Sequence, residues 1–208
     1  MAEIFTPYKI SYPYEGKLLL HCCCAPCSGV IIELLSFSKI DFSILFYNPN
    51  IYPKEEYELR KDHLKQFANK KNIPFIELDY DKENWEKEVS GLENEPERGK
   101  RCYKCFMMRL KKTAKYANKY GYKIFATSLG ISRWKDIKQI NLCGEKAASE
   151  VQNVSYWPYN WRKKGASQGM YEIAKREEFY MQKYCGCIYS YQASIAKKQS
   201  NIKLSILF

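Results

Sequence analysis

The sequence has no long hydrophobic run. No stretch of its 208 residues approaches the ~18 consecutive apolar residues of a membrane-spanning helix. The N-terminus is polar, and the apolar residues 18–20 are too few for the hydrophobic core of a signal peptide. We therefore expect a soluble, cytoplasmic protein without a membrane partner.

Histidine is also scarce, with two residues in the chain. His63 falls in the middle of a predicted helix, where a surface position is common, and His21 ends the first predicted strand. A histidine at the end of that strand either donates a proton or is a hydrogen-bonded core residue, and the sequence leaves both open. Asp79 and Asp81 could bind a metal or act as an acid; capping of the short helix that follows is the alternative.

Positive charge is abundant instead. Lys and Arg number 34 against 23 Asp and Glu, a formal net charge of +11. This surplus favours a polyanionic partner, most commonly nucleic acid, although a lysine-rich solvated surface explains it equally well. Trp157, Tyr159 and Trp161 lie beside the basic residues 162–164. Their rings could stack on bases, and buried core positions are the alternative.

Strand-like and helix-like segments alternate along the chain. The predicted strands cover about residues 17–22, 42–46, 74–78, 123–127 and, as a fifth candidate, 151–154; the predicted helices cover about 26–37, 54–71, 85–89, 106–117, 137–147 and 168–184. This alternation predicts an α/β fold with a doubly wound, mostly parallel, Rossmann-like sheet. We expect a single domain with an N-terminal arm (1–16), an α/β core (17–155) and a helical, cysteine-containing C-terminal extension (156–208).

Nine cysteines without a secretory signal point to metal or redox chemistry rather than to a disulfide scaffold. Eight of them fall in three groups: 22–24 with 27, 102 with 105, and 185 with 187. The first group follows a buried apolar run, and Pro26 then suits the first turn of a helix, so these thiols belong at the carboxyl edge of the sheet. Cys143 stands alone in a helical pattern that is typical of a small buried hydrophobic residue.

The first two groups together provide at least four thiolate ligands. Cys102 and Cys105 open a helix, whose N-terminus favours thiolates. A Cys₄ zinc or an iron–sulfur cluster fits, and three contiguous cysteines favour the cluster, because structural zinc commonly uses two separated pairs. Within the first group Cys24 and Cys27 form the easier geometric pair, since neighbouring strand residues point to opposite faces.

Cys185 and Cys187 enclose a single glycine. A disulfide between them would close a small, strained ring, and strained disulfides tend to be catalytic or labile. Gly186 supplies the backbone freedom that such a ring needs. A redox pair is the favoured interpretation, and metal ligation is the alternative.

Four motifs occur in order along nearly the whole chain: His-x-Cys-Cys-Ala-Pro-Cys-Ser at 21–28, Tyr-Asn-Pro-Asn-Ile at 47–51, Arg-Cys-x-x-Cys-Phe-x-x-Arg-Leu at 101–110 and Tyr-Cys-Gly-Cys-x-Tyr-Ser at 184–190. Together they resemble the cobalamin-independent epoxyqueuosine reductases. The resemblance implies an iron–sulfur enzyme with the nucleotide-hydrolase-like (HUP) Rossmann fold. Its activity would be the last step of queuosine biosynthesis, the reduction of the epoxide of epoxyqueuosine in tRNA.

The resemblance also implies roles for individual cysteines. A [4Fe-4S] cluster would be held by Cys23, Cys24, Cys102 and Cys105. Cys185 and Cys187 would form a redox-active disulfide. Cys27 would lie near the cluster, at an adjacent mononuclear iron or zinc with an acidic partner, and Cys22 would have no role.

Removing the epoxide oxygen to leave an alkene takes two electrons and two protons and releases water. A cluster passes one electron at a time, whereas a dithiol supplies two, and an unidentified donor must replace them. His21 or Asp81 could give a proton. Two rivals stay open: a zinc-stabilised RNA-binding module without catalysis, and an ATP-dependent tRNA thiolation enzyme. The rival enzyme carries a Gly-rich phosphate loop, whereas residues 25–29 here hold one glycine and no acid.

Overall fold

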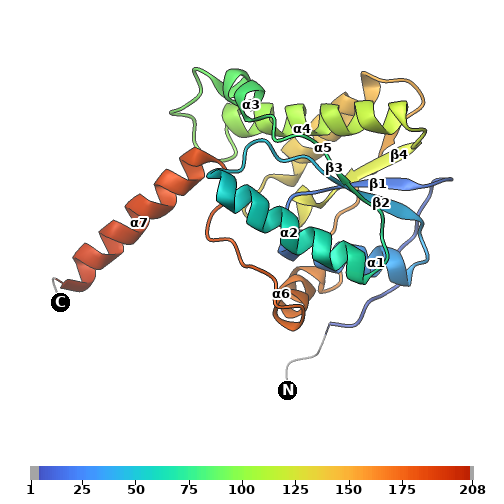
Figure 1. Cartoon of the computed structure of the whole chain (residues 1–208), viewed down its shortest axis with the longest axis horizontal. Coiled ribbons are helices and arrows are strands. Elements are labelled where there is room, and N and C mark those ends of the chain that lie inside the picture. The colour runs from blue at the N-terminus through green and yellow to red at the C-terminus, as the bar shows by residue number, and fades with distance from the viewer. Residues whose placement is uncertain (1–4, 207–208) are drawn as a thin grey trace.

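The computed structural model describes residues 5–206, and at its centre lies a sheet of five parallel strands (Figure 1). The strands, in the spatial order β3-β2-β1-β4-β5, are β1 Leu18–Cys22, β2 Phe42–Phe46, β3 Phe75–Glu77, β4 Ile124–Thr127 and β5 Ser155–Tyr156. The predicted doubly wound α/β fold is confirmed. The fifth strand follows the predicted 151–154 rather than coinciding with it, because Ser155 and Tyr156 are the residues that pair with β4.

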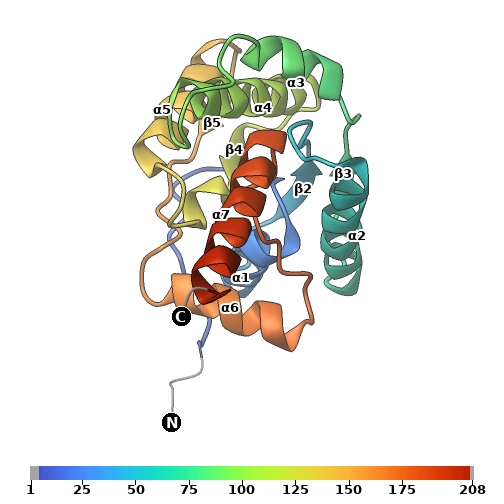
Figure 2. The same ribbon diagram turned by 90° about the vertical axis from the view of Figure 1, so that its left-hand side faces the viewer.

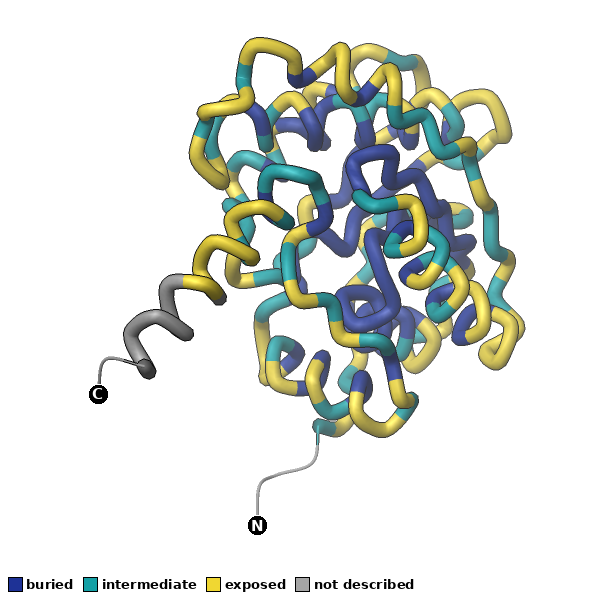
Figure 3. Tube along the Cα trace, turned by 60° about the vertical axis from the view of Figure 1, so that its left-hand side comes forward, coloured by how far each residue is buried: buried dark blue, intermediate teal, exposed yellow. Residues whose placement is uncertain are grey.

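Helices cover both faces of the sheet (Figures 1 and 2). One face carries α1 Ala25–Phe37, α2 Lys54–Lys70 and α6 Ala166–Arg176, and the other carries α3 Lys82–Val89, α4 Lys100–Lys119 and α5 Ile137–Ser149. A short 3-10 helix, η1 Ser128–Ile131, follows β4. The last helix, α7 Ile188–Ile206, projects from the body of the protein and is largely exposed where its burial is described (Figure 3). Within residues 5–206, no helix combines the length and apolar character needed to cross a membrane.

The parallel register brings the carboxyl ends of the three central strands to one edge of the sheet. Cys22 at the end of β1 pairs with Phe46 of β2, and His21 pairs with Thr127 of β4. The loops that follow these strands therefore meet at this edge, where open α/β sheets build their sites. It is the edge to which the sequence assigns the first cysteine group.

The aromatic segment 156–164 belongs largely to the core. Trp157 and Trp161 are 5% and 1% exposed, and the indole Nε1 of Trp161 donates to the Thr127 carbonyl at 3.0 Å. Trp157 packs edge-on against Tyr12 of the N-terminal segment, with ring centroids 5.1 Å apart. The base-stacking interpretation of these two tryptophans is wrong, because their rings are buried and cannot reach a nucleic acid.

The C-terminal segment differs most from the prediction. The helix expected at 168–184 ends at Arg176, because Glu178 adopts a left-handed backbone conformation (φ 52°) and the chain turns back. Phe179, 7% exposed, then packs so closely on α1 that a Cβ at Gly29 would lie 2.8 Å from its ring. This contact directs residues 177–187 across the carboxyl edge of the sheet without regular secondary structure.

Candidate functional site

Three thiols converge where β1 turns into α1. The Sγ atoms of Cys23, Cys24 and Cys27 lie within 4.8 Å of one another, and those of Cys23 and Cys24 are 3.7 Å apart. We call these three buried residues the triad. The strand ends at Cys22, so the alternation of strand faces no longer separates the next two residues, and Pro26 in the first turn of α1 brings Cys27 back toward them. The pair favoured by spacing is thus part of a larger group.

The triad readily carries one negative charge but not three. Hydrogen bonds from the thiols of Cys24 and Cys27 lower the pKa of Cys23 well below its usual value, although burial opposes this. Through the same hydrogen bonds the pKa of Cys24 rises to about 12, and that of Cys27 rises as well. Further deprotonation calls for a cation, because neighbouring buried thiolates repel one another. Three sulfur ligands suit a thiolate-binding metal such as zinc or the iron of an iron–sulfur cluster.

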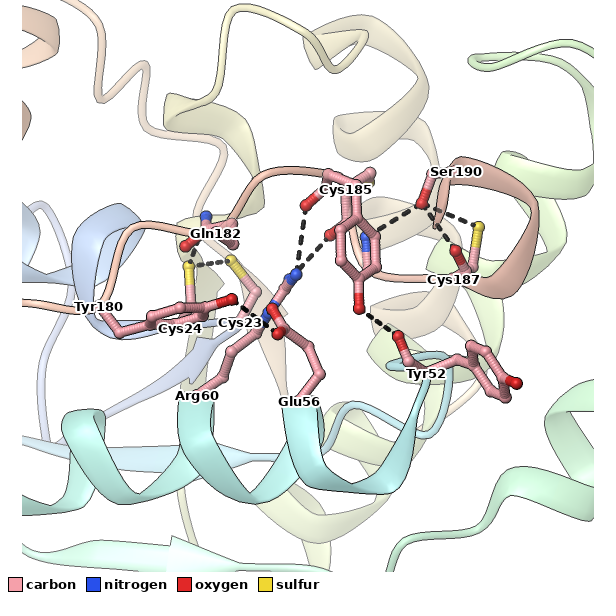
Figure 4. A network of polar contacts seen from close by, with 12 residues as sticks. Cys23, Cys24, Tyr52, Glu56, Arg60, Tyr180, Gln182, Cys185, Cys187 and Ser190 are labelled. Carbon is pink, nitrogen blue, oxygen red and sulfur yellow. Dashed lines mark hydrogen bonds and ion pairs between the residues drawn. The ribbon is translucent and has the colours of Figure 1, made fainter. Parts of the chain in front are cut away.

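Gln182 covers the triad from the C-terminal segment. Its Nε2 donates to Cys24 Sγ at 3.2 Å (Figure 4). It also donates to Cys27 Sγ at 3.8 Å. Its Oε1 is buried and finds no hydrogen-bond partner among the described residues. From η1, the Ser128 hydroxyl accepts from the Cys23 backbone N–H at 3.2 Å and donates to Cys23 Sγ at 3.5 Å. Donors of this kind orient metal-bound sulfur, so the surroundings of the triad fit a metal centre.

A cavity of about 500 Å³ opens beside the triad, and we call it the cysteine cavity. One or two members of each of the three cysteine groups line it: Cys27, Cys102, Cys185 and Cys187. Its lining also holds six cationic residues and one acidic residue: Arg98, Arg101, Arg133, Lys135, Lys183 and Lys197 against Glu97. This charge balance suits an anionic ligand.

Cys102 and Cys105 occupy the first turns of α4. Burial raises the pKa of Cys102 to about 12, and the thiols of Cys185 and Cys187 add to this rise. Cys105 is 8% exposed and packs in a small apolar cluster with Trp85. Among the described residues, neither Cys102 nor Cys105 belongs to the group of cysteines whose Sγ atoms lie within 4.8 Å of one another. The structure therefore places Cys102 on the cavity and Cys105 in a cluster that Cys187 packs against, and it brings neither into the triad itself.

Cys185 and Cys187 are free thiols on a turn that side-chain hydrogen bonds position (Figure 4). Arg60 of α2 donates to the Cys185 carbonyl at 3.0 Å and forms a buried ion pair with Glu56 at 2.7 Å. Gly186 has a φ of 145°, and a Cβ there would lie 3.1 Å from Arg60 Nη1, so this position requires glycine. Local sequence patterns could not reveal this role of Arg60, since 125 residues separate it from Cys185.

Comparison with known proteins points to one family. A family model described as epoxyqueuosine reductase QueH matches residues 18–193. The epoxyqueuosine reductase QueH of Acinetobacter baylyi is 54% identical over 205 residues, which cover 96% of this chain and 94% of the relative. That of Haemophilus influenzae is 57% identical over 180 residues, covering 86% of this chain and 74% of the relative. The chain belongs to the epoxyqueuosine reductase QueH family.

The family assignment confirms the resemblance carried by the four motifs, and it makes the chain a member of a family of oxidoreductases. Among solved structures, the U34-tRNA thiolase NcsA from Methanococcus maripaludis with its [4Fe-4S] cluster is similar in fold. The TM-score is 0.53 at 13% identity, over 91% of this chain and 67% of that chain. This likeness shows the fold, whereas the QueH match sets the chain apart from the thiolation enzyme and the zinc-stabilised binding module.

His21, the first residue of the first QueH-like motif, is fully buried. Its Nδ1 lies 2.8 Å from Thr127 Oγ1, and its Nε2 lies 3.1 Å from the Tyr47 carbonyl oxygen. Burial, together with the nearby Arg109 guanidinium, lowers the pKa of His21 to about 3. The imidazole is therefore neutral at pH 7 and joins three strand ends, which matches the core alternative rather than the proton donor.

Asp81 lies at the N-cap position of α3, but its side chain makes no capping hydrogen bond there. Its carboxylate accepts from the Tyr47 hydroxyl at 3.1 Å and from Asn84 Nδ2 at 2.7 Å. It does not belong to the described lining of the cysteine cavity. A role for Asp81 as an acid or metal ligand stays a prediction.

Lys135 is a cavity residue that the sequence reasoning missed. It lies between η1 and α5, where the Arg162 guanidinium donates to its carbonyl at 2.9 Å. Burial alone would lower the pKa of its ammonium, but negative charge on the sulfur atoms of Cys185 and the triad raises this pKa above its usual value. Lys135 is therefore charged at neutral pH beside the sulfur atoms. The available signal was a basic pair, 133 and 135, soon after a strand that ends at the carboxyl edge.

Proposed function

We propose that this chain reduces the epoxide of epoxyqueuosine in tRNA to the alkene of queuosine. Membership of the QueH family supports the reaction. The observation that carries the location is the cysteine cavity, where all three cysteine groups meet beside six cationic residues. The cations suit the phosphates of tRNA, and the sulfur atoms suit the metal and redox chemistry that the reduction requires.

The proposed ligands of a [4Fe-4S] cluster are Cys23, Cys24, Cys102 and Cys105. The burial and 3.7 Å approach of the first two support their part, and the position of Cys102 on the same cavity as Cys27 supports that of Cys102, with Cys105 one helical turn further along α4. Cys27, the remaining thiol of the triad, is left for an adjacent mononuclear iron or zinc. When bound, the cluster would pass electrons one at a time. Gln182 and Ser128 would donate hydrogen bonds to its sulfur ligands.

Cys185 and Cys187 are proposed as the redox pair of the reaction. Oxidation of two thiols to one disulfide releases two electrons and two protons. Deoxygenation breaks both C–O bonds of the epoxide, consumes two electrons and two protons, and releases water, so the two half-reactions balance. An external electron donor must then reduce the disulfide. The Arg60 contact and Gly186 would hold both thiols in the cavity wall throughout this cycle.

Turnover of the modified tRNA tests the proposal. Anaerobically purified protein would be incubated with tRNA that carries epoxyqueuosine and with a chemical reductant. The digested nucleosides would then be analysed by mass spectrometry. We expect a product lighter by one oxygen atom. Iron-loaded protein that leaves epoxyqueuosine unchanged would contradict the proposed function, and a colourless protein with one zinc would contradict the proposed cluster.

A further inference from the structure

Trp134 is a large, solvent-exposed apolar side chain at the cysteine cavity. It is 72% exposed and lines the cavity, whereas the other three tryptophans of the chain, at 85, 157 and 161, are at most 5% exposed. Tryptophan gains most of its stabilising effect from burial, so an exposed indole suits a surface that a partner covers. The exposure of Trp134 would have a simpler explanation if the loop that carries it were loosely held. The hydrogen bonds around Trp134 show whether the loop is held in place.

Two arginines hold the backbone that carries Trp134. The Arg98 guanidinium donates to the Trp134 carbonyl at 2.9 Å and to the Arg133 carbonyl at 3.3 Å. On the other side, Arg162 donates to the carbonyl oxygens of residues 130, 132 and 135 at 2.6–2.9 Å. The Asp136 carboxylate caps α5 directly after the segment. Five carbonyls are thus satisfied by two guanidinium groups, and the indole is displayed by an ordered segment.

The charges around this indole indicate the chemistry of its partner. Arg133 and Lys135 flank Trp134 in sequence, and the described lining of the cavity has six cationic residues against one acidic residue. An aromatic ring among cations is the combination that binds single-stranded nucleic acid, because bases stack on the ring while the cations contact phosphates. A surface with so few acidic residues suits RNA as a partner better than it suits a protein whose surface carries both charges.

We propose that Trp134 is a stacking platform for an unpaired nucleobase of the tRNA substrate, close to the modified nucleotide, and that Arg133 contacts an adjacent phosphate. The stacked base holds the RNA at the mouth of the cavity while the modified base enters it. This inference rests on the proposed function for the identity of the RNA. The cavity geometry and the exposed indole support it independently of the cluster ligands.

The test compares RNA binding by Trp134→Ala, Trp134→Phe and wild-type protein. The probe is the tRNA that carries epoxyqueuosine, and its affinity is measured by fluorescence anisotropy over a range of salt concentrations. Trp134→Ala should weaken binding roughly 5- to 150-fold at every salt concentration, with the log–log salt slope unchanged, because stacking involves no counterion. Trp134→Phe should restore most of the affinity. Arg133→Ala should instead reduce the slope by about 0.7–0.9.

Tyr120→Ala is the matched control. This tyrosine is 54% exposed, and it lies at the opposite end of α4 from Cys102, about 27 Å away by helical rise. Its loss should not change the affinity. Acrylamide quenching adds a direct readout: Trp134 is the one exposed tryptophan of the four, so bound tRNA should protect it. Equal iron content and circular dichroism in all variants would show that the fold is retained.

Two results would overturn the inference, and they differ in what they say about the proposed function. If Trp134→Ala binds tRNA as tightly as wild type while wild type still converts epoxyqueuosine, the stacking role is wrong and the proposed function stands. If iron-loaded wild-type protein neither binds nor converts the tRNA, both fail. Quenching of Trp134 that bound tRNA leaves unprotected would also rule out stacking.

Discussion

The triad and the Cys185–Cys187 turn border one cavity but are held there in different ways. The triad is part of the turn between β1 and α1, and its residues are among the buried core of the protein. The C-terminal turn has no regular secondary structure, and its position depends on side chains such as Arg60 and Ser190. Its residues keep part of their surface exposed apart from Gly186.

This difference matches two kinds of chemistry. A core turn has little freedom to rearrange, because moving it would disturb close-packed apolar side chains, and this rigidity suits ligands of a resident metal centre. A turn held by hydrogen bonds and by one buried ion pair can adjust locally, and this suits two thiols that approach and separate during a redox cycle. The substitutions below are ordered from the largest expected effect to the smallest.

Replacing either Cys185 or Cys187 by Ser should have the largest effect on turnover. The dithiol would lose its ability to release two electrons, so the rate should fall on the order of 10³-fold or more, the scale seen when a reacting group is removed. The iron content should not change, because the proposed ligands lie elsewhere. Mass spectrometry of the modified nucleoside and iron analysis of the same samples check both statements. Loss of iron together with activity would instead identify these thiols as metal ligands.

Gly186→Ala tests whether the position of the two thiols matters for the reaction, because it moves the turn while both thiols remain. The φ of 145° and the 3.1 Å approach to Arg60 force the turn to move when a Cβ is added. A shift of about 1 Å in the reacting groups can cost up to roughly 100-fold in rate, and we expect a loss of 10- to 100-fold with both thiols and all iron retained.

Gly16→Ala is the matched control for that substitution. Gly16 also has a positive φ, 89°, but a Cβ there meets no atom of residues 5–206 within 4 Å. Both variants therefore carry backbone strain, and Gly186→Ala alone disturbs the contact with Arg60. Equal turnover by the two variants would show that the fixed geometry of the C-terminal turn does not matter for the reaction.

The buried His21 should have the smallest effect, and on stability rather than on the reaction. Its pKa is lowered to about 3 in the folded protein, so stability is full above the unfolded value near 6.5 and falls as the pH drops below it. Between pH 7 and 5 the free energy of unfolding should decrease by about 2 kcal/mol more in wild type than in His21→Gln. Urea denaturation at both pH values measures this. Identical pH dependence in the two proteins would mean that His21 is not held neutral.

The sheet and the position of the first cysteine group could be predicted from the sequence, because both depend on local residue patterns. A buried apolar strand that ends in thiols, followed by Pro26, predicts a strand–turn–helix unit, and the alternation of elements predicts parallel strands. The carboxyl ends of such strands share one edge, so the location of the candidate site follows from topology alone. The convergence of Cys27 with Cys23 and Cys24 could not be predicted in this way, because it depends on the path of the backbone through the turn.

The C-terminal part could not be predicted in the same way, because tertiary contacts determine it. A helical pattern continues past Arg176, yet the left-handed residue Glu178 ends the helix, and the packing of Phe179 against Gly29 directs Gln182 onto the triad. The role of Arg60 depends on a contact between distant parts of the chain. The role of Trp134 could not be predicted either, because it depends on the solvent exposure of the side chain, which a sequence pattern does not indicate.

Iron and sulfide analysis with EPR spectroscopy of Cys24→Ala and Cys187→Ser tests the contrast between the two cysteine groups most directly, with Cys143→Ala as the control. Anaerobically purified wild type and Cys143→Ala should each contain about four iron and four sulfide per chain, the stoichiometry of a [4Fe-4S] centre. Cys24→Ala should lose most of this iron and its EPR signal on reduction, whereas Cys187→Ser should keep both. Retention of the cluster in Cys24→Ala with its loss from Cys187→Ser would contradict the account.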